Sequence, residues 1–236
     1  LTATTSSAGT ATYTITPSAN GCTGTPINIV VTVSPKPIIT NTALQLLTTI
    51  CSNTVLNFTP VSTTDPATLY SWTSVVSGST FTGVLASGTG TITDTPVNTG
   101  NTVGYVTYTI TPEVAGCFGN SVNYIVTVFP TPTADGSDII ICSGQNAVVL
   151  INSLPNNVAG TTFSWVAVPS ANVLGAANGN GSTISQTLSV TDFTTGTVVY
   201  QITPSANGCA GAVKNITITI NPLPTADAGV DYQVCE

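Results

Sequence analysis

The sequence has 236 residues and a formal net charge of −7, with two basic residues, nine acidic residues and no histidine. General acid–base catalysis near neutral pH usually uses histidine, and phosphate binding needs clustered lysine or arginine, so this composition argues against an enzyme and against a nucleic-acid partner. Apolar runs such as residues 27–33 and 138–142 are far too short to cross a bilayer, and no signal-peptide pattern opens the sequence. We therefore expect a soluble segment with no membrane insertion.

Threonine, valine and isoleucine are abundant, whereas the good helix formers are scarce or missing. β-Branched side chains are stiff and pack well on a pleated sheet, and they are poorer helix formers. This usage predicts an all-β fold with almost no helix.

Three copies of one phrase organise the chain. Residues 13–24 read Tyr-Thr-Ile-Thr-Pro-Ser-Ala-Asn-Gly-Cys-Thr-Gly, and similar phrases follow at residues 108–119 and 200–211. The cysteines of these phrases recur 95 and 92 residues apart, at Cys22, Cys117 and Cys209. Self-similarity at a fixed period is the signature of a tandem array.

A second set of cysteines recurs in the same frame, 91 and 93 residues apart, at Cys51, Cys142 and Cys235. Alternating or wholly apolar segments, typical of strands, occupy residues 29–33, 125–128 and 216–220. A proline-rich junction follows each of these segments, at residues 35–37, 130–132 and 222–224. Proline there ends strand pairing and stiffens the connection between neighbouring repeats.

These signals predict four parts: the closing strands of a truncated repeat (1–35), two complete repeats (36–130 and 131–222), and the start of a further repeat (223–236). A unit of about 92 residues with some seven short strands predicts an immunoglobulin-like β-sandwich. The cores of the two complete repeats are then expected to hold Trp72, Trp165, Tyr108 and Tyr200.

Nearly the whole chain resembles the PKD-like and immunoglobulin-like repeats of very large Bacteroidota surface proteins, including the SprB-type gliding-motility adhesin. The recurring tyrosine phrase carries the resemblance, together with Cys-Ser-Gly at 142–144, Phe-Ser-Trp at 163–165 and Ala-Asp-Ala-Gly-Val-Asp at 226–231. The resemblance implies secretion, commonly through the type IX system, and a stalk or adhesive array on the bacterial cell surface. It identifies no ligand, and residues 34–50 depart from it because they lack the aspartate-containing phrase of the two later junctions.

Six cysteines with no histidine and no Cys-x-x-Cys spacing indicate disulfides formed in an oxidising compartment, not a zinc site. Two sets of pairs fit the recurrence: Cys51–Cys117 with Cys142–Cys209 inside the repeats, or Cys22–Cys51, Cys117–Cys142 and Cys209–Cys235 across the junctions. We favour the first set, because the last strand of a repeat carries the chain roughly 30 Å while a disulfide needs Cα atoms within about 7 Å. This choice requires that the Cys-Ser-Gly phrase begins the first strand.

Six of the nine acidic residues form two groups that we take as equivalent: Asp94, Asp135 and Asp138, and then Asp192, Asp227 and Asp231. One member of each group precedes the tyrosine strand, and the other two lie in the linker that enters the next sandwich. Each trio would then converge on a junction, where carboxylates and backbone carbonyls could coordinate Ca²⁺. Solvated acids and turn-forming aspartates are the alternative reading, and no other cofactor is expected.

The leading hypothesis is a noncatalytic extracellular stalk or adhesin array on a bacterial cell surface. The alternative is a binding module whose sandwich-end loops, such as residues 154–162, 169–181 or 78–90, bind a glycan or a protein. A third hypothesis is a subunit of a surface filament or homopolymer, because the strands of residues 1–35 are marginally stable without complementation. The expected partners are other repeats of the same chain and a surface glycan or protein.

Overall fold

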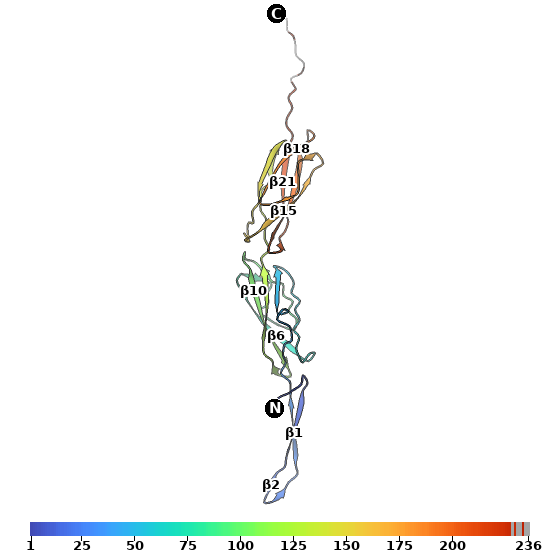
Figure 1. Cartoon of the computed structure of the whole chain (residues 1–236), viewed down its shortest axis with the longest axis vertical. Coiled ribbons are helices and arrows are strands. Elements are labelled where there is room, and N and C mark those ends of the chain that lie inside the picture. The colour runs from blue at the N-terminus through green and yellow to red at the C-terminus, as the bar shows by residue number, and fades with distance from the viewer. Residues whose placement is uncertain (228, 230–232, 234–236) are drawn as a thin grey trace. The chain divides into compact units, whose positions relative to one another are not determined.

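The computed structural model describes residues 1–227, 229 and 233, and every regular element among them is a β-strand. The chain divides into two units, Leu1–Pro130 and Thr131–Glu236 (Figure 1). The expected all-β fold, built from tandem immunoglobulin-like sandwich repeats, is confirmed. No helix that could span a membrane is found in this described part of the chain.

Residues 1–35 form a two-stranded antiparallel ribbon with a short second hairpin at its tip. The strands are β1 (Gly9–Ile15), β2 (Ser18–Ala19), β3 (Cys22–Thr23) and β4 (Ile27–Val33). In the ribbon, Tyr13 pairs with Ile29, and the side chains of both residues are 48% exposed. The ribbon therefore repeats the tyrosine strand of the later repeats without burying its apolar residues.

Residues 36–130, which we call repeat 2, form one large sheet and an irregular second layer. The strands are β5 (Leu47–Cys51), β6 (Leu69–Ser77), β7 (Phe81–Thr82), β8 (Ser87–Thr89), β9 (Val97–Asn98), β10 (Gly104–Val114), β11 (Cys117–Phe118) and β12 (Val122–Phe129). The large sheet has the order β5-β12-β10-β6-β8, with β11 paired to β10. Within this sheet, β5 and β12 come first and last along the chain, and they are neighbours that run parallel. The other neighbouring strands are antiparallel.

The second layer of repeat 2 is held by the β7–β9 pair and by a bridge between Phe58 and Ile92. Its side chains meet those of the large sheet in one core, where Trp72 packs edge-on against Tyr108 with ring centroids 5.5 Å apart. Trp72 is 5% exposed and Tyr108 is fully buried, so the predicted core placement of both residues is confirmed.

Residues 131–222, which we call repeat 3, form a more regular sandwich. The strands are β13 (Ile139–Cys142), β14 (Gln145–Leu150), β15 (Thr162–Pro169), β16 (Val173–Leu174), β17 (Gly179–Asn180), β18 (Thr183–Val190), β19 (Gly196–Ala206), β20 (Cys209–Ala210) and β21 (Lys214–Asn221). One sheet has the order β13-β21-β19-β15-β17, with β20 paired to β19, and the other has the order β14-β18-β16. As in repeat 2, the strands of the larger sheet that come first and last along the chain, β13 and β21, are parallel neighbours.

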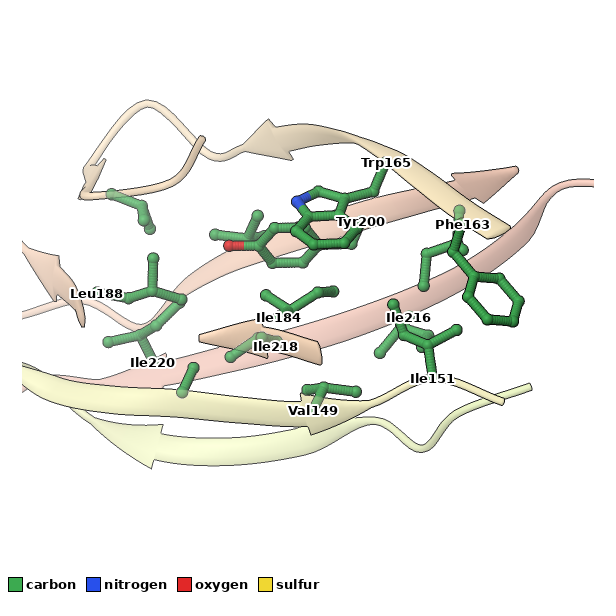
Figure 2. Packing of buried hydrophobic residues seen from close by; sticks show 14 residues of the cluster. Val149, Ile151, Phe163, Trp165, Ile184, Leu188, Tyr200, Ile216, Ile218 and Ile220 are labelled. Carbon is green, nitrogen blue, oxygen red and sulfur yellow. The ribbon is translucent and has the colours of Figure 1, made fainter. Parts of the chain in front are cut away.

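Strict alternation of side chains along the strands builds the core of repeat 3, because successive residues point to opposite faces of a sheet. Tyr200 of β19, Ile184 of β18 and Ile218 of β21 are fully buried, and Trp165 is 7% exposed. Figure 2 shows these four side chains pointing into the space between the two sheets. Their burial confirms the predicted core positions of Trp165 and Tyr200.

Both tryptophans lie over a glycine of the neighbouring strand. A Cβ atom at Gly88 would lie 2.3 Å from Cζ2 of Trp72, and one at Gly179 would lie 2.6 Å from the same atom of Trp165. These glycines belong to the short strands β8 and β17, which pair with β6 and β15 opposite the tryptophans. Glycine is needed there because the indole ring occupies the space of a side chain.

Gly179→Ala is expected to lower the free energy of unfolding of repeat 3 by about 1–3 kcal/mol, because Trp165 must leave its rotamer or the strands must separate. Urea unfolding followed by tryptophan fluorescence measures this change. The neighbouring Asn180→Ala is the control: its side chain is exposed, and the substitution should change stability by less than about 0.5 kcal/mol. Equal stability of the two variants would contradict the packing argument.

Candidate functional site

Two cysteines of the second set, Cys51 and Cys142, end the first strands of their repeats. Cys51 is the last residue of β5 and pairs with Phe129 at the end of β12. Cys142 is the last residue of β13 and pairs with Asn221 at the end of β21. Because each first strand is parallel to the last strand, these cysteines lie at the end of the sandwich where the last strand ends.

In repeats 2 and 3, the cysteine of the tyrosine phrase lies at the opposite end of the sandwich. Cys117 in β11 pairs with Val114 at the end of β10, and Cys209 in β20 pairs with Ala206 at the end of β19. Strand β10 is antiparallel to β12, so its end lies beside the start of β12. The length of β12, roughly 23 Å, therefore separates Cys51 from Cys117, which is too far for a disulfide.

The predicted pairs Cys51–Cys117 and Cys142–Cys209 are therefore wrong. Cys51 and Cys209 are disulfide-bonded, whereas Cys22, Cys117 and Cys142 are free. The same free thiols exclude the alternative pairs Cys22–Cys51 and Cys117–Cys142. The prediction failed because the Cys-Ser-Gly phrase ends the first strand instead of beginning it.

In the alternative set, the pair Cys209–Cys235 involves a cysteine that lies outside the described residues. What the structure establishes is a disulfide at Cys209, in the hairpin of repeat 3, where the side chain is 2% exposed. A buried disulfide of this kind supports the expectation of an oxidising compartment.

Maleimide labelling of the denatured, unreduced chain is expected to modify Cys22, Cys117 and Cys142 and to spare Cys51 and Cys209, because only free thiols react. Peptide mass spectrometry before and after reduction locates the labels. The Cys142→Ser variant should lose one label and keep the rest of the pattern. A cross-linked peptide that contains Cys117 or Cys142 would contradict the assignment.

The acidic residue Asp94 lies inside the sandwich of repeat 2, where it is 7% exposed. Its Oδ2 atom accepts hydrogen bonds from the Tyr108 hydroxyl at 2.8 Å and from the Leu85 backbone N–H at 3.0 Å. Burial and, secondarily, the hydrogen bond to Asp94 raise the pKa of Tyr108 well above its ordinary value near 10. Asp94 is therefore the partner that satisfies a buried tyrosine hydroxyl.

In repeat 3 the residue that corresponds to Asp94 is Gln186, whereas the sequence grouping took Asp192 as the equivalent of Asp94. The Tyr200 hydroxyl donates to Oε1 of Gln186 at 2.6 Å, and both acceptors precede their tyrosines by 14 residues. Burial raises the pKa of Tyr200 to about 12. Asp192 lies on the surface between β18 and β19, where hydrogen bonds from Thr194 and then Asn172 lower its pKa.

Three of the four remaining acids of the predicted calcium sites have a partner of their own or make a local turn. Oδ1 of Asp135 lies 3.8 Å from Nζ of Lys214. Oδ1 of Asp138 accepts the backbone N–H of Thr217 at 2.8 Å. Asp227 accepts the N–H of Gly229 in a local turn, and Asp231 lies outside the described residues.

Within the residues that the structure describes, no three His, Cys, Asp or Glu side chains are grouped so that they could hold a metal ion. Asp94 is held inside repeat 2 by Tyr108, which removes the predicted equivalence between the two trios. Calcium binding by the other acids stays a prediction.

Tyr108→Phe is expected to lower the free energy of unfolding of repeat 2 by about 1.5–3 kcal/mol, because the Asp94 carboxylate then stays buried with one donor fewer. Tyr200→Phe is the matched variant of repeat 3 and should cost only about 0.5–1.5 kcal/mol, since the neutral Gln186 amide also keeps two hydrogen bonds to the backbone of Ala177. Chemical denaturation of both variants measures the difference. A smaller cost for Tyr108→Phe would contradict it.

The outward face of the larger sheet of repeat 3 is hollowed by a groove of about 500 Å³. Thr162 and Ser164 of β15, Thr203 and Ser205 of β19, and Asn180 of β17 line it. A second hollow of about 370 Å³ shares Ser164, Asn180 and Thr203 and continues along the same face. Sequence reasoning pointed to loops 154–162, 169–181 and 78–90, and only the last residues of the first two loops reach this groove.

The family model described as a PKD-like domain matches residues 1–37, 48–132 and 140–224. No curated protein sequence matches the chain.

Several solved structures of tandem immunoglobulin domains and adhesion proteins are similar to the chain, with low sequence identity and low TM-scores. An I-band fragment of titin is 11% identical with a TM-score of 0.39, and the match covers 91% of this chain and 75% of that chain. The two-domain DIP-gamma structure is 9% identical with a TM-score of 0.36, over 81% of this chain and 99% of that chain. The human desmocollin-1 ectodomain is 11% identical with a TM-score of 0.34, over 92% of this chain and 48% of that chain.

Proposed function

Because the chain belongs to the PKD-like domain family, we propose that it is a noncatalytic segment of an extracellular protein on a bacterial cell surface, where its repeats form a stalk or adhesive array. The observation that carries the proposal is the parallel pairing of the first and last strands in both complete repeats. Because the first and last strands of a repeat are parallel, the chain enters the repeat at one end of the sandwich and leaves it at the other. This is the geometry that a string of repeats needs.

The same pairing suits a protein that is pulled from its ends. Force applied to β5 and β12 in opposite directions loads the five register pairs from Leu47–Ile125 to Cys51–Phe129 together, in shear. In repeat 3 the corresponding pairs run from Ile139–Ile218 to Cys142–Asn221. Bonds that are loaded together resist force better than bonds that open one at a time.

A recurring glycine allows close packing at the point where the chain enters each repeat. In the phrase that ends in Cys-x-Gly, a Cβ atom at Gly119 would lie 2.1 Å from the carbonyl oxygen of Pro37, and one at Gly211 would lie 1.9 Å from that of Pro132. The proline segment that enters each repeat is therefore packed against the hairpin of that same repeat. Because proline also restricts the backbone, the repeat begins with a stiff segment.

The bacterial surface location, the type IX secretion route and the gliding-motility role are supported by the resemblance of the recurring phrases to Bacteroidota surface repeats. The scarcity of basic residues and the lack of histidine in the sequence support a noncatalytic role. The disulfide state of Cys51 and Cys209 supports an extracellular location.

Single-molecule pulling of the chain from its two ends in the presence of a reductant is expected to give two discrete unfolding events, one for each complete repeat. Each event should lengthen the chain by roughly 300 Å, since extended backbone spans at most about 3.6 Å per residue. The variant Thr48→Pro removes a backbone N–H that faces β12, because residues 46, 48, 50 and 52 are the ones that β5 turns toward β12. It should lower the unfolding force of repeat 2 alone, which leaves repeat 3 as an internal control. Gradual extension without discrete unfolding events would contradict the proposal that the repeats form a stalk.

A further inference from the structure

The outward face of the sheet β17-β15-β19 in repeat 3 carries a row of small polar side chains that crosses three strands. Ser164 of β15 pairs with Asn180 of β17 on one side and with Thr203 of β19 on the other. The next row along the strands is Thr162 with Ser205. Neighbouring strands lie about 4.8 Å apart, so the rows form a closely spaced array of hydroxyl and amide groups.

The row of Ser164, Asn180 and Thr203, which we call the middle row, has unused hydrogen-bonding capacity. Within the part of the chain that the structure describes, the side chains of Ser164, Asn180 and Thr203 make no hydrogen bond, although both hollows are lined by all three. A hydroxyl offers one donor and two acceptor sites, and an amide offers donors and acceptors together. The row can therefore recognise a ligand that presents donors and acceptors at close spacing.

Charge restricts the ligand further. The residues that line the two hollows include no acidic and no basic side chain. The whole chain carries a net charge of −7, which repels anions at a distance. A hydroxyl-rich neutral ligand fits these conditions better than an anionic polysaccharide or a charged peptide.

The backbone of β15 is occupied at the row that contains Ser164. Strand β15 is paired to β19 along its whole length and to β17 at Ser164 and Trp165, so a peptide cannot add to β15 as a further strand at these two residues. At this row, a ligand is therefore contacted through side chains. Hydroxyl and amide groups without a protein partner can both donate to and accept from a sugar hydroxyl.

Repeat 2 provides the contrast within the same chain. The corresponding middle row is Thr89, Ser71 and Thr111, but the Thr111 hydroxyl lies 2.8 Å from the Ser121 hydroxyl and is already hydrogen-bonded. The next row there is Leu69 with Glu113, where repeat 3 has Thr162 with Ser205. The face of repeat 2 is therefore partly used, partly apolar and acidic.

From these observations we infer that the outward face of β17-β15-β19 in repeat 3 is a binding site for a neutral glycan, contacted through Ser164, Asn180 and Thr203. An open face of this kind binds a glycan segment weakly. The inference extends the adhesive part of the proposed function and does not depend on the mechanical part.

Affinity electrophoresis tests this inference, because the negative chain migrates in native gels that contain a polysaccharide. The probes are four neutral polysaccharides, dextran, laminarin, mannan and xylan, and one anionic polysaccharide, alginate. At least one neutral polysaccharide is expected to retard the chain. The double variant Ser164→Ala/Thr203→Val should weaken the apparent affinity about tenfold or more, because two hydroxyl groups that would bond to the glycan are removed.

The matched control is Ser71→Ala/Thr111→Val, which makes the same changes at the corresponding positions of repeat 2 and should leave retardation unchanged. Circular dichroism and urea unfolding establish that both double variants are folded. The inference is overturned if no neutral polysaccharide retards the chain, if only alginate does, or if the two double variants lose affinity equally. Pulling experiments read out the stalk separately, so either proposal can fail without the other.

Discussion

The structure of each complete repeat depends on the double pairing of its last strand. This strand pairs in parallel with the first strand and in antiparallel with the tyrosine strand, as β12 does with β5 and β10. The parallel partner sets the direction in which the chain enters the repeat, and the antiparallel partner delivers the tyrosine to the core. The positions of both cysteines and of the junction prolines follow from this arrangement.

The cores are organised around a tyrosine whose hydroxyl must be satisfied inside the sandwich. A buried hydroxyl without a partner costs free energy, so each repeat supplies an acceptor from the strand or segment that faces the tyrosine. Repeat 2 uses Asp94 and repeat 3 uses Gln186, at the same distance along the chain from Tyr108 and Tyr200. One structural requirement is thus met by two different residue types. The Asp94 carboxylate can be buried because the Tyr108 hydroxyl and the Leu85 backbone N–H both donate hydrogen bonds to it.

The faces of the two repeats differ more than their cores do. Both cores bury a tryptophan over a glycine and a tyrosine with a polar partner, whereas the outward faces of the two sheets carry different rows of side chains. In a tandem array, this allows the interior to be kept for stability while the exposed face of a single repeat acquires a binding preference. The uncommitted polar row of repeat 3 is an example of such a difference.

Much of this protein is readable from its sequence alone. The period of the two cysteine phrases, the alternation of apolar residues and the proline junctions predict an all-β tandem array, and the recurring aromatic residues Trp72, Trp165, Tyr108 and Tyr200 are correctly predicted to lie in the cores. These features are local or periodic, so they need no knowledge of which strands become neighbours.

Only the tertiary structure decided the features that depend on strand neighbours and register. Whether Cys51 begins or ends its strand, and so lies near to or far from Cys117, depends on the parallel pairing of β5 with β12, which no local pattern encodes. The burial of Asp94 depends on its position opposite Tyr108 across the sandwich, and the row of Ser164, Asn180 and Thr203 depends on three strands that are distant in sequence. Sequence periodicity determines which face a residue occupies, and pairing between distant strands determines what lies beside it.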